Sequence, residues 1–254
     1  MRYLSFIVLF IIGFHAQGQR STIPLSDTIP IGIVTYAQST GNPYLAHMNG
    51  ETTLLFNKNR SVYINNCAPK GYISYPTESG TMVNESGDPE GFPVYKMHSE
   101  KQIYYKTHTV LSKKKVVVRD TLGAIPWEIY PEFKQFGPYT CQKAIGAFRG
   151  RTYEAWFAPD IPIPSGPYKL GGLPGLILEA QSIDGFVKFL FVKLEFSPTI
   201  SNFIVPPHGK YLGLNYDELQ IAEDEQSLKQ EKEAKARGNE ITISRDPGAI
   251  EIGN

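Results

Sequence analysis

The sequence has few of the residues that build metal or nucleophilic centres. There are 2 cysteines and 5 histidines in 254 residues, and the histidines are scattered singly. No zinc-protease helix spacing, Cys-x-x-Cys pair or Gly-x-Ser-x-Gly elbow is present, and no glycine-rich phosphate loop precedes a helix. His47-Met48 and Met97-His98 suggest soft copper ligands, but neighbours on a strand point to opposite faces. We therefore expect no metal site, no cofactor and no catalytic motif readable in the chain.

Charge of one sign is not in excess. The chain has 25 basic and 25 acidic residues, whereas a nucleic-acid surface needs a basic patch. Beyond the N-terminus, no apolar run approaches the roughly 20 residues that a membrane-spanning helix needs. The composition thus predicts neither a nucleic-acid partner nor a transmembrane span.

The N-terminus has the three parts of a secretory signal peptide. Met1 and Arg2 precede the apolar run Leu4–Phe14, and small residues follow at Ala16 and Gly18. A membrane anchor is the alternative, but this run is too short to span a bilayer. We expect residues 1–18 to be removed and the rest to be soluble in the periplasm or outside the cell.

The two cysteines are predicted to form a disulfide. An even number of cysteines in an exported chain favours pairing, so Cys67 is expected to bridge to Cys141. Two free buried thiols are the alternative.

Aromatic and turn-forming residues indicate a β-rich fold. The chain has 15 tyrosines, 14 phenylalanines and 19 prolines, which favour strands and turns over helices. We predict one domain over residues 19–254, mainly β, with a large curved antiparallel sheet or an open β-barrel. Residues 70–91 are predicted to be a long loop. The strand Phe186–Phe196 is apolar on both faces, so we expect its middle to be buried on both sides.

One helix is predicted near the C-terminus, over about residues 217–237. Asn215 and Glu218 have the spacing of a capping box, and Gly238 suits the end of the helix. The apolar stripe is thin, so we expect a largely solvated helix, followed by a short tail.

The most specific stretch contains Gly172, Leu173, Pro174, Gly175, Leu176 and Ile177. Pro174 and Gly175 suit the two central positions of a type II turn, with Gly175 at positive φ. This would make a sharp bend between two strands.

That stretch also carries a resemblance. It spells the signature of the GLPGLI family of exported Bacteroidetes proteins. Similar blocks precede it in order: Cys141–Ala144, Phe148–Arg151, Ala155–Phe157, Asp160–Pro162 and Gly166–Tyr168. The resemblance implies an exported β-rich protein of unknown function, in some cases encoded beside TonB-dependent outer-membrane receptors. It implies no catalytic residues.

Five residues before the signature form a candidate binding face: Arg149, Arg151, Tyr153, Trp156 and Tyr168. Strand alternation puts the two arginines and Tyr153 on one face. Two arginines there cannot both be buried unpaired, so they line a wet surface or bind an anionic partner. The aromatic residues either line an apolar cavity or belong to the core.

These observations predict a non-enzymatic binding module for a hydrophobic small molecule or for an outer-membrane partner, such as a TonB-dependent receptor system. One alternative is a hydrolase whose site assembles from distant residues such as His108 and Asp160. Another is a structural component of an envelope complex. A convergent titratable cluster in a cleft would favour the enzyme. A dry aromatic concavity would favour ligand binding, and an exposed apolar patch would favour a protein partner.

Overall fold

The structure is a computed structural model. It describes residues 31–238 except 42–45, 47, 67–71, 77–81, 87–91, 110–111, 198–203, 205–206 and 208. The expected signal peptide, the C-terminal tail and Cys67 lie outside the described residues.

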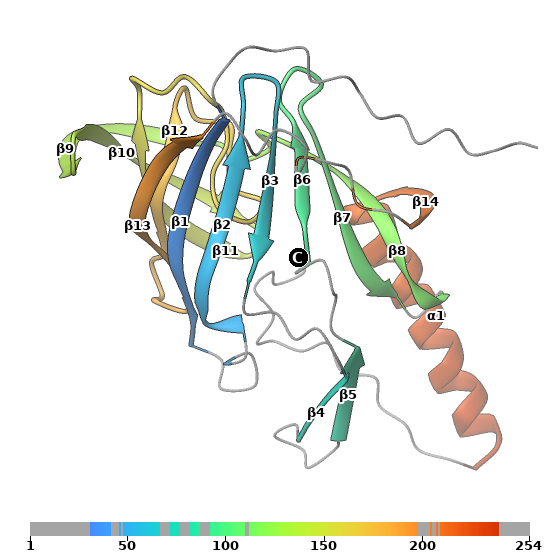
Figure 1. Cartoon of the computed structure of the whole chain (residues 1–254). Helices are drawn as coiled ribbons and strands as arrows, with labels where there is room; N and C mark the ends of the chain where they lie inside the picture. The colour runs from blue at the N-terminus through green and yellow to red at the C-terminus, as the bar shows by residue number, and fades with distance from the viewer. Residues whose placement is uncertain are drawn as a thin grey trace, which may run out of the picture.

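A 12-stranded sheet makes up most of the protein (Figure 1). Its order is β14-β8-β7-β6-β3-β2-β1-β13-β12-β11-β10-β9. The strands are β1 Ile31–Thr40, β2 Gly50–Phe56, β3 Arg60–Asn65, β6 Val94–Met97, β7 Gln102–Thr109, β8 Ser112–Thr121, β9 Glu128–Phe136, β10 Tyr139–Phe148, β11 Arg151–Ala158, β12 Leu176–Ser182, β13 Val187–Ser197 and β14 Lys210–Asn215. The mainly β prediction is confirmed, and the curved sheet is open because β9 and β14 lie at separate ends of this order.

The sheet consists of two meanders joined at its centre. Strands β1, β2, β3, β6, β7 and β8 follow one another in one half, and β9 to β13 follow one another in the other. The halves meet where β1 pairs antiparallel with β13, from Ile31 opposite Ser197 to Thr40 opposite Val187. Among the described strands, the exception to antiparallel pairing is β14, which runs parallel to β8.

The predicted loop over residues 70–91 contains a small separate sheet. Strand β4 (Tyr72–Pro76) pairs antiparallel with β5 (Met82–Ser86). The loop prediction was wrong for these two strands. Each strand is only a few residues long, and the surrounding Gly, Ser and acidic residues are typical of loops.

Strand β13 is buried on one side only, so the prediction of burial on both sides was wrong. Thr35 lies opposite Lys193, but Tyr36 lies opposite Phe191, so Val192 is an extra residue in a bulge. Leu190 and Val192 remain 41% and 46% exposed.

The β11–β12 connection, residues 159–175, packs on the face of the sheet that carries the main core. The Tyr36 hydroxyl on β1 donates to the Ile177 carbonyl just beyond it, at 2.7 Å. Trp127 Nε1 donates to the Gly171 carbonyl at 2.9 Å. Leu170 and Leu173 of the connection are both 1% exposed. The connection therefore fills the concave side of the sheet with the chain's own atoms.

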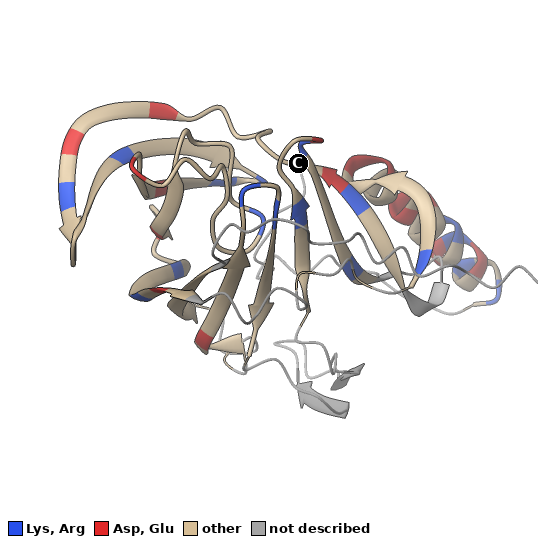
Figure 2. Ribbon diagram, turned by 45° about the horizontal axis from the view of Figure 1, so that its top comes forward, with Lys and Arg blue, Asp and Glu red and all other residues tan. Residues whose placement is uncertain are grey.

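Helix α1, Tyr216–Ala236, confirms the predicted helix to within one residue. The capping box is present: Asn215 Oδ1 accepts from the Glu218 amide at 2.9 Å, and Glu218 Oε2 accepts from the Asn215 amide at 2.8 Å. Leu219 is the buried residue of the helix, which projects from the body with mixed charges along it (Figures 1 and 2). Across the described residues, no helix has the length and apolar character needed to cross a bilayer.

Candidate functional site

The hairpin turn between β10 and β11 places Arg149. Arg149 and Gly150 have φ values of 49° and 74°, as the two central residues of a type I′ turn require. Strand β11 begins only at Arg151. Arg149 therefore lies in a turn and not on the strand face that the sequence pattern predicted.

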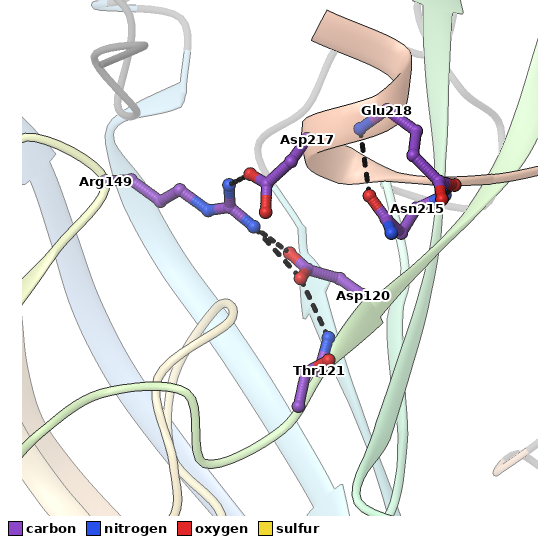
Figure 3. Close-up of polar contacts among 6 residues, drawn as sticks. All are labelled: Asp120, Thr121, Arg149, Asn215, Asp217 and Glu218. Carbon is purple, nitrogen blue, oxygen red and sulfur yellow. Dashed lines mark hydrogen bonds and ion pairs between the residues drawn. The ribbon is translucent and has the colours of Figure 1, made fainter.

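Arg149 lies at the centre of an ionic cluster (Figure 3). Its Nη2 bonds both carboxylate oxygens of Asp120 on β8 at 3.0 Å, and its Nη1 bonds Asp217 in the first turn of α1. The guanidinium carbon lies 3.5 Å from the centre of the Tyr216 ring. Asp120 also accepts from the Thr121 amide at 2.8 Å. The cluster joins the β10–β11 turn to β8 and to the start of the helix.

Arg151 has a separate partner at the β12–β13 turn. Its Nη1 bonds Asp184, and its guanidinium lies 3.9 Å over the Phe186 ring. Burial opposes ionisation of Asp184, but bonds from the Ser182 hydroxyl and the Phe186 amide, together with the Arg151 charge, outweigh it and lower its pKa. Both predicted arginines thus have anionic partners within the chain.

The three aromatic residues of the predicted face do not converge. Tyr153 is 3% exposed and belongs to the core. Trp156 is half-buried, and its Nε1 donates to Glu154 at 3.2 Å. Tyr168 lies in the β11–β12 connection, where its ring meets Tyr63 edge to face at 6.3 Å. The structure therefore separates the five residues. Arg149 lies in the ionic cluster and Arg151 pairs with Asp184, whereas Tyr153 belongs to the core, Trp156 packs against the core and Tyr168 lies in the connection.

The signature stretch is a close-packed element. Leu173, Leu176 and Ile177 are at most 1% exposed. Gly172, not Gly175, has the positive φ, at 90°, so the predicted conformation of Gly175 was wrong. A Cβ on Gly175 would instead lie well under 3.0 Å from the Ala158 carbonyl oxygen. Glycine is needed there because two backbone segments approach closely.

Cys141 is fully buried, and among the described residues its sulfur has no disulfide partner. Burial, followed by the nearby charges of Glu179 and Asp160, raises its pKa to about 12. Because Cys67 is not among the described residues, the cross-link stays a prediction.

The structure contains a buried polar cluster that was not predicted from the sequence. Lys96 on β6, which is 0% exposed, donates from Nζ to the carbonyls of Gly166 and Leu170 at 2.5 and 2.9 Å. Ser165 Oγ lies 3.5 Å from the same nitrogen. The one available signal was strand alternation, which puts Lys96 on the same face as buried Val94. A lysine at such a position is ordinarily solvated, so the pattern did not indicate a site.

His98 and Ser61 extend that cluster. Ser61 Oγ lies 2.8 Å from Ser165 Oγ, and His98 Nε2 lies 3.0 Å from Ser61 Oγ. Burial, and the positive charge of Lys96, lower the pKa of His98 to about 4, although its bond to the Lys58 carbonyl opposes this. Within the described ranges, no group of three or more His, Cys, Asp or Glu side chains is placed to hold a metal ion.

Comparison with known proteins matches one segment to a family. A model of the Porph_ging family, described as a protein of unknown function, matches residues 147–179. This segment runs from the end of β10 through the β10–β11 turn and the signature into β12. No curated protein matches the chain.

The fold is similar to that of PNGF-II. A structure of PNGF-II in the C2 space group has a TM-score of 0.50 and 14% identity, over 78% of this chain and 33% of that one. A second, in P21, has a TM-score of 0.49 and 15% identity, over 72% and 32%. The chain spans about a third of the length of the PNGF-II chains. At this identity the likeness shows the fold alone.

Proposed function

We propose that this chain is an exported, GLPGLI-like binding module that recognises a protein partner along the exposed edge strand β9. The supporting observation is that β9 is an edge strand with exposed apolar side chains. It is the last strand of the sheet, and its Phe133 and Ile129 side chains are 63% and 45% exposed. The β9–β10 hairpin also reaches beyond the body as a curved arm (Figures 1 and 2).

An exposed edge can accept an extended segment of another protein by adding it as a further strand. Pro131 lacks an amide proton and lies where the pairing of β9 with β10 shifts register, which limits such pairing near the middle of the strand. The half of β9 after this point continues to the turn at Gly137. The side chain of Phe133 then offers an apolar anchor for the partner.

The filled concave face supports a protein partner over a hydrophobic ligand. The β11–β12 connection occupies this face, and Tyr36 and Tyr63 beneath it are buried. The outer-membrane or envelope identity of the partner rests on the family resemblance. An adjacent receptor gene would agree with it.

The hydrolase alternative has weaker support. Asp160 is exposed in the turn after β11. The side chain of His108 lies outside the described part of the structure, so the pairing of these two residues is untested. Ser61, Ser165 and His98 lie close together, but they are at most 7% exposed.

Site-specific photo-crosslinking tests the proposal. Benzoylphenylalanine is introduced in place of Phe133 in the full chain, expressed in the source cells. The control position is Ile221 on α1, which is 60% exposed. We expect a discrete protein adduct from position 133 alone, and its loss when Ile129→Asp is added. Equal adducts from both positions, or none from either, would contradict the proposal.

A further inference from the structure

Four buried side chains from two strands and the connection form an unbroken line. Ser61 belongs to β3, Lys96 to β6, His98 follows β6, and Ser165 belongs to the β11–β12 connection. Lys96, Ser61 and Ser165 are 0% exposed, and His98 is 7% exposed. Along the line the three distances are 3.5 Å, 2.8 Å and 3.0 Å. The longest distance joins Lys96 Nζ to Ser165 Oγ, and the flexible lysine side chain allows this distance to shorten.

A carbonyl at each end fixes how the line can be protonated. His98 Nδ1 lies 3.1 Å from the Lys58 carbonyl, and a carbonyl only accepts, so Nδ1 carries a hydrogen. Nε2 of the neutral ring then accepts from Ser61. At the other end, the Gly166 and Leu170 carbonyls take two hydrogens of the Lys96 nitrogen. The third position of that nitrogen faces Ser165, as a donor when charged and as an acceptor when neutral.

Counting hydrogens gives the preferred charge of the line. It has three links, and each serine supplies one hydrogen. The count starts from a neutral Lys96 amine and a neutral His98 ring. In that state one of the three links has no hydrogen. If both Lys96 and His98 carry an additional proton, two donors meet at one link. With one additional proton, on either Lys96 or His98, every link has one donor and one acceptor.

We propose that Lys96, Ser165, Ser61 and His98 form a relay that holds a single additional proton and passes it between its two ends. In the transfer, Lys96 Nζ gives a proton to Ser165 Oγ, Ser165 gives its own to Ser61 Oγ, and Ser61 gives its own to His98 Nε2. Only N–H and O–H bonds break and form. Lys96 ends as a neutral amine that accepts from Ser165, and His98 ends as an imidazolium.

The surroundings favour one additional proton over two. Among the described residues, Lys96 has no carboxylate partner. Lys58 and Lys101 bond His98 through backbone atoms, and Arg60 precedes Ser61 on β3, so three basic residues lie beside the line. One acidic residue, Glu100, lies in the turn that follows His98. His98 joins the line through the neutral hydroxyl of Ser61, and the connection contributes the neutral hydroxyl of Ser165. Burial lowers the pKa of Lys96 well below its ordinary value, and its three acceptors oppose this by bonding the ammonium form.

The relay fastens the connection to the sheet. The Gly166 and Leu170 carbonyls both belong to residues 159–175, and both bond the Lys96 nitrogen. A second additional proton would make two donors face one another at one link. Loss of the single additional proton would leave one link without a hydrogen. Either change weakens the attachment of the segment that leads into the signature.

Nuclear magnetic resonance of the ¹⁵N-labelled full chain tests the relay. The measurement is the tautomer and pKa of His98, assigned with His98→Gln, in the wild type, Lys96→Met, Ser165→Ala and the double variant. Lys96→Met should raise the proton affinity of His98 about tenfold or more. In the Ser165→Ala background, Lys96→Met should raise the proton affinity of His98 about threefold or less, because the loss of the Ser165 hydroxyl has already interrupted the hydrogen-bonded line. An equal rise in both backgrounds would show a through-space charge effect and overturn the relay.

The wild type still tests the predicted hydrogen count by itself if Lys96→Met does not fold. At neutral pH, the relay requires a neutral His98 with its hydrogen on Nδ1 and a protected ammonium signal from Lys96, or an imidazolium with a neutral amine. A hydrogen on Nε2 of a neutral ring, or both ends neutral, would overturn it. As a matched control, Lys193→Met, at a lysine whose side chain is 55% exposed, should leave the His98 signals unchanged.

Discussion

Individual residues in the signature stretch are constrained by backbone proximity more than by turn chemistry. Pro174-Gly175 is a common turn dipeptide, and its local pattern predicted a positive φ at Gly175. In the fold, Gly172 takes that conformation and Gly175 packs against the Ala158 carbonyl. The approach joins the end of β11 to the start of β12, so residues 15 or more positions apart determine it. The residues next to Gly175 in the sequence therefore could not predict this contact.

Gly175→Ala should therefore destabilise the protein by about 1–3 kcal/mol, the usual cost of overpacking. The nearest atoms belong to the backbone of Ala158 and Pro159, which cannot rotate away as a side chain would. Gly137→Ala is the matched control for strain alone, because φ there is 54° and nothing lies within 4 Å of the added Cβ; it should cost about 1–2 kcal/mol. Urea midpoints at constant m-value measure both. A Gly175→Ala midpoint equal to that of the wild type would contradict the close approach.

His98 should make the protein sensitive to mild acid. Its pKa is about 4 in the folded protein and near 6.5 when unfolded, so the unfolded chain binds more protons between these values. The contribution to stability is complete above pH 6.5 and is lost as the pH falls toward 4, by about 3 kcal/mol in total. Urea midpoints measured from pH 7 to pH 4 should fall more steeply for the wild type than for His98→Gln. Parallel curves for the two proteins would show that His98 titrates as it does in water.

Secondary-structure elements divide into those that local sequence specifies and those that need tertiary contacts. Helix α1 was predictable because Asn215 and Glu218 cap it within four residues. The one-sided burial of β13 was not, because the bulge at Val192 depends on pairing with β1. Lys96 is the same case in a strand: alternation gave its face, but the three acceptors that make burial tolerable come from a connection about 70 residues away.

Arg149 should control how firmly α1 is attached. Arg149→Ala would remove the guanidinium nitrogen that bonds both oxygens of buried Asp120, at a cost of about 3 kcal/mol. Arg149→Lys keeps the charge but loses the paired bonds and the flat stack on Tyr216, so its effect should be intermediate.

Hydrogen exchange measures this attachment. Amides that have intrahelical partners near the start of α1, those of residues 220–224, should exchange faster in Arg149→Ala than in the wild type, with a smaller increase in Arg149→Lys. Arg237→Ala, at the exposed far end of the same helix, should change nothing there. Unchanged protection in Arg149→Ala would show that Leu219 alone holds the helix.

At the scale of the whole molecule, the expected cross-link and the buried thiol make different predictions. Cys141 is inaccessible in the folded protein either way. Alkylation must therefore be done in denaturant without reductant, on protein recovered from the periplasm or medium. A Cys67–Cys141 bridge predicts no added mass and a chain that begins near Gln19. Two alkylated cysteines would refute the bridge, and an intact Met1 in the membrane fraction would refute export.

The pairing of β1 with β13 has a consequence for the order of events as the chain is made. The first strand of the sheet lies beside a strand about 150 residues later in the sequence, so its own neighbour on that side is absent until Ser197 has emerged. Closing so long a loop is slow, and until then β1 presents an unpaired edge that other chains can join. The edge stays open in the same way as an exported chain leaves the membrane, because β13 crosses about 150 residues after β1. Folding helpers that shield nascent strands should accordingly bind the first meander, and a chain stopped before β13 should aggregate although most of its core residues are already present.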